Sequence, residues 1–352
     1  MQQFKVGLCA FGMSGKVFHA PFLKQHPNFL LSAIVERTKN ESREKYPDAT
    51  IYRSVEEMLS DSDVDIVVVN TPVQTHFEFA KKALQAGKNL IVEKPFTVSV
   101  AEAAELSSLA RAHQKFISVY QNRRFDRDFL QVKKVIASEK LGALKEVEIR
   151  FDRFRTTPGT KDHKENPALP GAGALHDLGS HLIDQTMVLF GPPTSVFADV
   201  FTMKEQAAAN DYFDILLRYK NGLRVRLKST VFAKESAYAY ILHGSRGSFL
   251  QMRSDAQEQE LIAGAAPLGQ DWQQILETAD GILSYEDSNG AHRVNTTSEP
   301  GNYMDYFDAI AHHLVAAKPL PSPASEVILN MRIIEAALKS AKTGAFVRLG
   351  QL

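Results

Sequence analysis

The chain has 352 residues, of which 44% are hydrophobic and 23% are charged, a composition typical of a globular protein with room for two domains. Its 41 basic and 41 acidic side chains balance, which argues against a nucleic-acid partner. The single cysteine, Cys9, excludes an internal disulfide and a cysteine-based zinc site. We find no signal peptide and no stretch suited to a membrane span, and therefore expect a cytoplasmic protein.

Short apolar runs alternate with amphipathic stretches over residues 1–121. The runs indicate buried parallel strands at residues 6–10, 30–35, 64–69, 89–92 and 116–119. Between them, Thr75 is expected to cap a helix that ends at Gly87, and Ser99 with Glu102 forms a capping-box pattern. This alternation predicts an α/β fold whose first domain, residues 1–121, is a doubly wound Rossmann sheet.

The pattern changes in residues 122–352, where consecutive strands follow one another. We expect helices at residues 125–138, 175–190, 303–317 and 324–342, and strands at 144–154, 195–203, 212–219, 223–232, 238–243 and 248–252. Asn221-Gly222 is a strong hairpin signal. A second α/β domain with a large, mainly antiparallel open sheet is predicted. The Pro/Gly-rich stretch 156–173 is too long for a plain connector, which is typical of functional or mobile loops.

A glycine-rich loop follows the first predicted strand. Ala10, Gly12 and Gly15 occupy the three positions of the dinucleotide fingerprint G-x-G-x-x-G, with alanine in the first. Gly12 allows the backbone to approach a pyrophosphate, and Gly15 allows the helix to pack on the strand. An ordinary strand-turn-helix connection is the alternative. The acidic Glu36 at the end of the second strand favours the dinucleotide interpretation.

The residues after the second strand bear on the choice of cofactor. The carboxylate of Glu36 is suited to the ribose hydroxyls and would repel a 2′-phosphate, which favours NAD. Arg37 can instead stack on adenine or pair with that phosphate, so NADP remains open.

Three polar side chains are candidates for proton transfer. Lys94 follows the fifth strand directly, at the edge of the sheet where ligands bind in open α/β folds, although a surface lysine also fits this position. Asp177 and His181 are four residues apart and share a face if a helix starts here, so the acid can orient the imidazole. A surface ion pair is the alternative. A metal site with His176 is disfavoured because His176 and Asp177 point apart on a helix.

These motifs together resemble the Gfo/Idh/MocA family of NAD(P)-dependent oxidoreductases over the whole chain. The resemblance rests on residues 10–15, on Asn70-Thr71-Pro72 with His76, on Glu93-Lys94-Pro95 and on residues 173–181. Residues 121–126 and 177–185 look closest to the branch of scyllo-inositol dehydrogenases. Glu36 departs from the pattern of strict NADP users, and Ala10 replaces a glycine.

The resemblance implies roles for individual residues. It implies a catalytic set of Lys94, Asp177 and His181. It implies a cofactor site formed by Ala10, Phe11, Gly12, Met13, Ser14, Gly15, Glu36, Arg37, Asn70, Thr71, Pro72, His76, Glu93, Lys94, Asn122 and Arg123. It implies a substrate site formed by Lys94, Arg123, Asp177, His181 and Tyr303, and no metal.

The sequence therefore predicts an NAD(P)-dependent dehydrogenase that transfers hydride between nicotinamide and a secondary hydroxyl or carbonyl of an inositol-like polyol or a sugar. A non-catalytic dinucleotide or sugar sensor on the same fold is the alternative, against which the retained Lys94, Asp177 and His181 argue. Strand 223–232 alternates Arg224, Arg226 and Lys228 with apolar residues, so one face of the second sheet is expected to be open. We expect this face to mediate a homodimer or homotetramer.

Overall fold

The computed structural model describes residues 3–60, 63–268, 272 and 276–350. The chain forms two compact units. The first unit contains residues 1–122, 256–272 and 302–328, and the second contains residues 123–255, 273–301 and 329–352. Residues far apart in the sequence therefore build each unit.

The first unit is built on a parallel sheet of six strands in the order β3-β2-β1-β4-β5-β6. The strands are β1 (Phe4–Leu8), β2 (Phe29–Val35), β3 (Thr50–Tyr52), β4 (Ile66–Val69), β5 (Asn89–Val92) and β6 (Ile117–Val119). The order reverses between β1 and β4, which is the point where doubly wound folds bind ligands. The predicted Rossmann sheet is confirmed.

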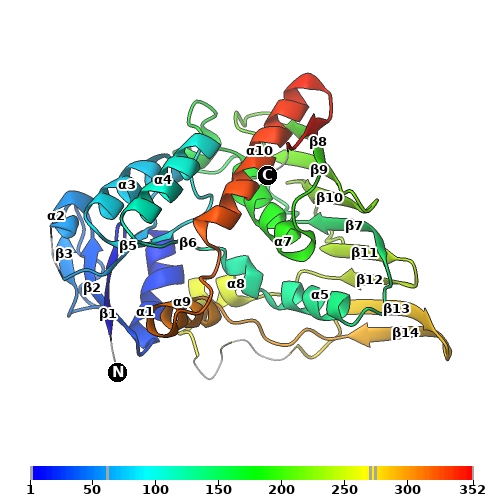
Figure 1. Ribbon diagram of the computed structural model, residues 1–352, viewed down its shortest axis with the longest axis horizontal. Helices are drawn as coiled ribbons and strands as arrows, with labels where there is room; N and C mark the ends of the chain where they lie inside the picture. Colours follow the sequence, from blue (N-terminus) through cyan, green and yellow to red (C-terminus); the bar gives the residue numbers. More distant parts are fainter. Residues whose placement is uncertain (1–2, 61–62, 269–271, 273–275, 351–352) are drawn as a thin grey trace. The chain divides into compact units, whose positions relative to one another are not determined.

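Helices cover this sheet (Figure 1). The helical segments of this unit are η1 (Gly15–His19), α1 (Ala20–Gln25), α2 (Val55–Leu59), η2 (Val73–Thr75), α3 (His76–Gln85), α4 (Val100–Ala112), α8 (Gln257–Ile262) and α9 (Met304–Ala316), of which α8 packs against η1. Met58, Leu84 and Leu106 from α2, α3 and α4 share one apolar core with strand residues such as Val67 and Val92. The strands read as continuous apolar runs because both faces of a parallel sheet are buried.

The second unit is built on a sheet of nine strands in the order β14-β13-β12-β11-β7-β10-β9-β8-β15. The strands are β7 (Leu144–Arg150), β8 (Ser195–Phe201), β9 (Tyr212–Arg218), β10 (Arg224–Ser229), β11 (Tyr240–Gly244), β12 (Gly247–Gln251), β13 (Gly281–Asp287), β14 (Gly290–Thr296) and β15 (Val347–Arg348). Only β7 and β10 pair in parallel among these neighbours. The predicted mainly antiparallel sheet is confirmed.

One face of the second sheet carries helices, and the other is open. The helical segments are η3 (Asn122–Phe125), α5 (Arg127–Ala137), α6 (Asp162–Glu165), η4 (Leu175–Gly179), α7 (Ser180–Phe190) and α10 (Ala324–Thr343), with α5 and α7 over one face of the strands (Figure 1). Along β10, Val225 and Leu227 are buried, whereas Arg224 and Arg226 are exposed. This alternation confirms the predicted one-sided sheet.

Several local predictions differ from the structure. The strand expected to reach residue 154 ends at Arg150, after which Phe151 and Arg153 still donate backbone hydrogen bonds to Lys228 O and Thr230 O. Thr75 stands at the start of α3 but donates its hydroxyl back to Pro72 O at 2.8 Å, so it does not cap the helix. Ser99 does cap α4 by accepting from Glu102 N at 3.2 Å. Within the described residues, no helix is both long and apolar enough to cross a membrane.

Candidate active site

The glycine loop connects β1 to the helical segment that starts at Gly15. A Cβ atom on Gly15 would lie 2.5 Å from Ala10 O, so only glycine lets this turn close. A Cβ atom on Gly12 would meet nothing within 4 Å, and Gly12 is exposed. Lys16 N donates to Gly12 O at 3.0 Å and begins the helix. The loop therefore combines an open backbone face with a helix start, as a pyrophosphate site requires.

Asn70, which directly follows β4, hydrogen-bonds to this loop. Its Oδ1 accepts from Ala10 N at 3.0 Å, and its Nδ2 donates to Ala10 O at 2.8 Å. Ser14 Oγ donates to Asn70 O at 3.1 Å. Phe11 is buried against Tyr46, whereas Met13 is exposed on the loop. The loop is thus bound to the strand on the other side of the point where the strand order reverses.

Glu36 lies at the end of β2, with its carboxylate engaged by the following turn. Its Oε2 accepts from Glu41 N and its Oε1 from Ser42 N, both at 2.9 Å, and Ser42 Oγ also donates to Oε1. Only 6% of Glu36 is exposed. Both carboxylate oxygens therefore stabilise the turn. Arg37 is exposed and forms no hydrogen bond or ion pair with another described residue.

Two lysines meet at the carboxylate of Glu41 beside this turn. Lys39 Nζ donates to Glu41 Oε1 at 2.7 Å, and Lys16 Nζ donates to Glu41 Oε2. The hydrogen bonds from Lys16 and Lys39 lower the pKa of Glu41 to about 2. Lys16 comes from the helix after the glycine loop and Lys39 from the turn after β2. Two positive charges thus gather around one exposed anion between these two segments.

Lys94 follows β5, and its neighbour Glu93 is held by His19. His19 Nε2 lies 2.9 Å from Glu93 Oε1, and Lys94 N donates to Glu93 Oε2 at 3.2 Å. Burial raises the pKa of Glu93, but the hydrogen bond with His19 and the nearby positive charges outweigh burial and leave it lowered. The Lys94–Pro95 peptide bond is cis. The carboxylate of Glu93 therefore contacts both the backbone amide of Lys94 and the ring of the buried His19.

His76 joins the segment after β4 to the segment after β5. Its Nε2 lies 2.8 Å from Thr71 O, and its Nδ1 lies 3.0 Å from Pro95 O. The ring is buried, and burial lowers its pKa despite the nearby carbonyl groups. His76 thus positions the backbones of Thr71 and Pro95.

Asp177 and His181 lie at the start of the helix formed by η4 and α7. The first segment, η4, is π-helical rather than α-helical. Asp177 Oδ1 accepts from Lys164 Nζ at 2.8 Å, and His181 is 4% exposed in the first turn of α7. His176 on the same turn is also buried, and its pKa is lowered mainly by burial. The structure therefore gives Asp177 a cation partner, Lys164, that the sequence interpretation did not include.

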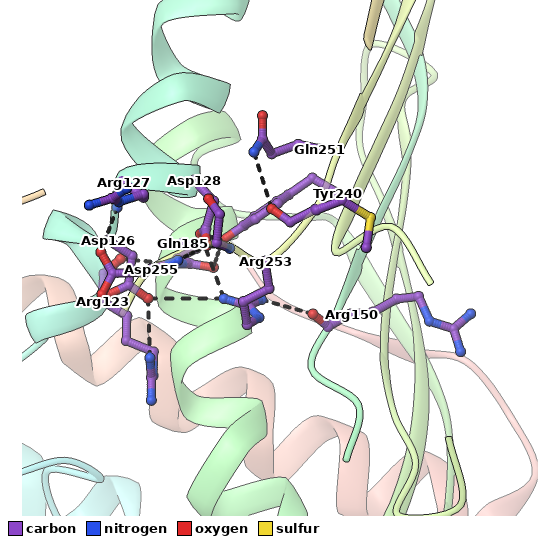
Figure 2. A network of polar contacts seen from close by, with 12 residues as sticks. Arg123, Asp126, Arg127, Asp128, Arg150, Gln185, Tyr240, Gln251, Arg253 and Asp255 are labelled. Carbon is purple, nitrogen blue, oxygen red and sulfur yellow. Dashed lines mark hydrogen bonds and ion pairs between the residues drawn. The ribbon is translucent and has the colours of Figure 1, made fainter. Parts of the chain in front are cut away.

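Arg123 belongs to a buried polar network in the second unit (Figure 2). Its Nη1 lies 3.2 Å from Asp126 Oδ2, and its guanidinium lies 4.8 Å from the ring centroid of Phe151. Gln185 Nε2, one turn after His181 on α7, donates to Arg123 O at 3.0 Å. Arg123 is thereby connected to the helix that carries His181.

The rest of this network joins the start of α5 to the segment after β12. Asp128 accepts from Ser254 N at 2.9 Å, and Asp255 accepts from Arg127 N at 2.9 Å. Tyr240 OH lies 3.1 Å from both Asp128 Oδ1 and Gln185 Oε1. These hydrogen bonds connect residues 123–128 to α7, to β11 and to the segment after β12.

Asn122 and Tyr303 are the remaining predicted site residues. Asn122 is buried at the start of η3, next to Arg123 in the chain. Tyr303 is fully buried, its ring lies near Phe18 and Phe22, and its backbone N donates to Gln257 Oε1 at 2.7 Å. Tyr303 thus contributes to the aromatic core of the first unit, and its contact with substrate remains a prediction.

The structure brings together some predicted site residues and leaves others in separate units. Residues 10–15 and Asn70 meet in the first unit, which also contains Lys94. Asp177 and His181 lie in the second unit. That Lys94 joins these two residues remains a prediction. The sequence interpretation missed Lys164, although the unusual length of stretch 156–173 was a signal that its side chains have a role.

Comparison with known proteins identifies both parts of the chain. Residues 4–121 match the oxidoreductase family with an NAD-binding Rossmann fold, and residues 129–250 match the GFO/IDH/MocA C-terminal domain. The chain is 38% identical to the uncharacterized oxidoreductase YdgJ of Escherichia coli, covering 96% of each chain. It is 34% identical to scyllo-inositol 2-dehydrogenase (NADP(+)) IolW of Bacillus subtilis, covering 96% of this chain and 94% of the relative.

Solved structures show the same fold over the full length. The oxidoreductase yvaA of Bacillus subtilis superposes with a TM-score of 0.94 at 34% identity, over 99% of both chains. An oxidoreductase of Bacteroides fragilis superposes with a TM-score of 0.89 at 40% identity, over 99% of this chain and 100% of the other. The chain belongs to the GFO/IDH/MocA family and is an NAD(P)-dependent dehydrogenase.

Proposed function

We propose that this dehydrogenase oxidises a secondary hydroxyl group of a cyclic polyol or sugar, with Lys94, Asp177 and His181 as its catalytic residues. The observation that carries the proposal is the helix start at η4, where a buried histidine follows an ion-paired aspartate by one turn. A polyol also fits the relative named as a scyllo-inositol dehydrogenase. We further propose that residues 1–121 are the dinucleotide-binding domain and residues 122–352 the substrate-binding and oligomerisation domain, with residues 256–272 and 302–328 packed in the first compact unit.

Each catalytic residue has a separate task in this proposal. His181 accepts the proton of the substrate hydroxyl, because histidine side chains as a class titrate closer to neutral pH than lysine side chains. Lys94 donates a hydrogen bond to the oxygen on which negative charge develops. Asp177 orients His181 or Lys94. A bound nicotinamide supplies the hydride acceptor, and the loop of residues 10–15 holds its pyrophosphate.

The cofactor we propose is NADP. The sequence favoured NAD because a free Glu36 carboxylate would repel a 2′-phosphate. In the structure, backbone amides of the following turn engage both oxygens of this carboxylate. The exposed charges nearby include Arg37 and the two lysines around Glu41. These cations favour a phosphate at the adenosine ribose.

Binding titrations test the cofactor proposal. We expect the protein to quench or shift NADPH fluorescence with a lower Kd than for NADH. Arg37→Ala should weaken NADPH binding roughly tenfold, as expected for one charge-assisted contact, and leave NADH binding unchanged. Arg43→Ala, which removes an exposed arginine from the same segment, is the matched control. Tighter binding of NADH, with no effect of Arg37→Ala, would contradict the proposal.

A substrate screen tests the reaction. The absorbance of reduced nicotinamide is followed with scyllo-inositol, myo-inositol, glucose and xylose, each with NADP and NAD. We expect cofactor reduction with at least one inositol and NADP. Tight binding of cofactor without reduction by any of these polyols would favour the sensor function instead.

We also propose that the open face of the nine-stranded sheet joins two copies of the chain. This face carries the charged side chains of β10 and partly exposed apolar residues such as Leu216 and Ile241. An open sheet face of this kind can pair with itself around a two-fold axis.

A further inference from the structure

Lys164, in the loop that precedes η4, forms an ion pair with the proposed catalytic residue Asp177. Its Nζ lies 2.8 Å from Asp177 Oδ1. Lys164 belongs to α6, a single turn within the Pro/Gly-rich stretch 156–173. A long loop thus supplies a cation to the active-site helix.

Backbone hydrogen bonds also connect Lys164 to Asp177, through Gly173. Gly173 N donates to Lys164 O at 2.9 Å, and Asp177 N donates to Gly173 O at 3.1 Å. The side-chain contact between Lys164 and Asp177 closes this path into a ring. The two residues are therefore joined through Gly173 as well as directly.

Gly173 and α6 are themselves fixed. Gly173 has a φ of +92°, and a Cβ atom there would lie 2.3 Å from Asn210 Nδ2, so the position requires glycine. Asn210 Oδ1 also accepts from Leu175 N at 2.9 Å. Within the loop, Gly159 N donates to Glu165 Oε1 at 2.8 Å and braces α6. The loop consequently presents Lys164 in a defined place.

The exposure of the pair indicates a role other than stability. The side chain of Lys164 is 41% exposed and that of Asp177 is 29% exposed. Ion pairs with this much solvent contact add little to folding stability. A loop that is anchored at Asn210, braced internally by the bond between Gly159 and Glu165, and able to form such a pair instead suits the placement of a reacting carboxylate.

We propose that Lys164 is a positioning residue, whose ammonium group holds the carboxylate of Asp177 in a single orientation for the reaction. The stretch 156–173 is then part of the active site. This inference rests on the proposed function, because it assigns Lys164 a task that is exerted through Asp177.

Three variants and steady-state kinetics test this role. With scyllo-inositol and NADP, Lys164→Gln should lower kcat roughly tenfold, the scale of one hydrogen bond to a charged group, and change KM by less than about twofold. Lys164→Arg should restore most of the loss because it keeps the charge. Lys220→Gln, which removes an exposed lysine from the same unit, should match the wild type. Equal turnover of Lys164→Gln and Lys220→Gln would overturn the inference.

A double-mutant cycle separates positioning from a general structural effect. Adding Lys164→Gln to Asp177→Asn should cost little further turnover, because the group through which Lys164 acts has already changed. The melting temperature and the Kd for NADPH should stay close to those of the wild type. Additive losses would overturn the inference while leaving the proposed function intact. A wild type that reduces NADP with none of the screened polyols would overturn the proposed function and this inference with it.

Discussion

The side-chain amide of Asn70 hydrogen-bonds at both ends to the backbone of Ala10, at 3.0 Å through Oδ1 and 2.8 Å through Nδ2. Asn70 ends β4 and Ala10 begins the glycine loop after β1, so this pair spans the point where the strand order reverses. The glycine loop therefore depends on a residue 60 positions away in the sequence.

Asn70→Ala should loosen the glycine loop and weaken the binding of NADPH and NADH alike. It removes two neutral hydrogen bonds and leaves the Ala10 amide without its acceptor, so we expect a loss of roughly tenfold or more in affinity. Fluorescence titration of each nucleotide measures this. Asn289→Ala, on an exposed turn between β13 and β14, serves as the control. Unchanged affinity in Asn70→Ala would show that the loop holds its shape without this clamp.

Glu36→Ala distinguishes two interpretations of one carboxylate. If Glu36 faced the ribose, its removal would improve the use of NADP relative to NAD. Because its oxygens accept from Glu41 N and Ser42 N, we expect instead weaker binding of both cofactors and a free energy of unfolding lower by about 1–3 kcal/mol. Glu44→Ala, at an exposed position of the same segment, should have little effect. A selective gain in NADP affinity would restore the ribose interpretation.

Two buried aspartates of the second unit should differ in how much stability the protein loses when each is replaced by asparagine. Burial, followed by the charge of Asp255, raises the pKa of Asp126 well above its usual range, so Asp126→Asn should be tolerated. Asp184 accepts from Arg124 Nε and Nη2, both at 2.7 Å, and Asp184→Asn should lower the free energy of unfolding by about 3 kcal/mol. Urea unfolding measures the free energy of unfolding of both variants. A larger loss of stability in Asp126→Asn than in Asp184→Asn would mean that Asp126 is ionised.

The raised pKa of Asp126 also predicts that the stability of the protein depends on pH. A carboxyl whose pKa is raised by folding stabilises the native state while protonated, and that contribution is lost as pH rises through the folded-state pKa. The free energy of unfolding of the wild type should therefore contain a component that decreases as pH increases. Asp126→Asn should lack it. Identical pH profiles for the two proteins would argue against a neutral Asp126.

Ile241→Glu should disrupt the proposed dimer. Ile241 lies on the open face of the sheet, where a carboxylate would have to be buried without a partner on association. Light scattering at micromolar concentration should show a dimer or tetramer for the wild type and a smaller species for the variant. Val315→Glu, at an exposed apolar position of α9, is the control. A monomeric wild type would remove this proposal.

The sequence predicted those features whose signal is local. The apolar runs of β4 and β5, the Asn221-Gly222 turn and the spacing of Gly12 and Gly15 each depend on neighbouring residues. The hairpin of β13 and β14 was missed although Asn289-Gly290 marks its turn, because β14 is largely exposed and has no clear apolar alternation.

Side-chain contacts made by irregular segments could not be predicted in this way. Glu41 and Ser42 lie only five and six residues after Glu36, but no residue pattern indicates that their backbone amides turn back onto its carboxylate. The partnership of Lys164 with Asp177 likewise depends on how a long loop returns to the start of η4. Such contacts follow from tertiary packing, which single-sequence patterns do not encode.

The most direct measurement is the turnover of the wild type, Lys94→Ala and His181→Ala with scyllo-inositol and NADP, followed by nicotinamide absorbance. We expect both variants to lose roughly a hundredfold or more in kcat, the scale for an oxyanion donor or a general base, and Asp177→Asn to be impaired as well. All variants should retain NADPH binding, because the loop of residues 10–15 that is proposed to hold the pyrophosphate is unchanged. Near-normal turnover in His181→Ala would contradict the proposed catalytic set.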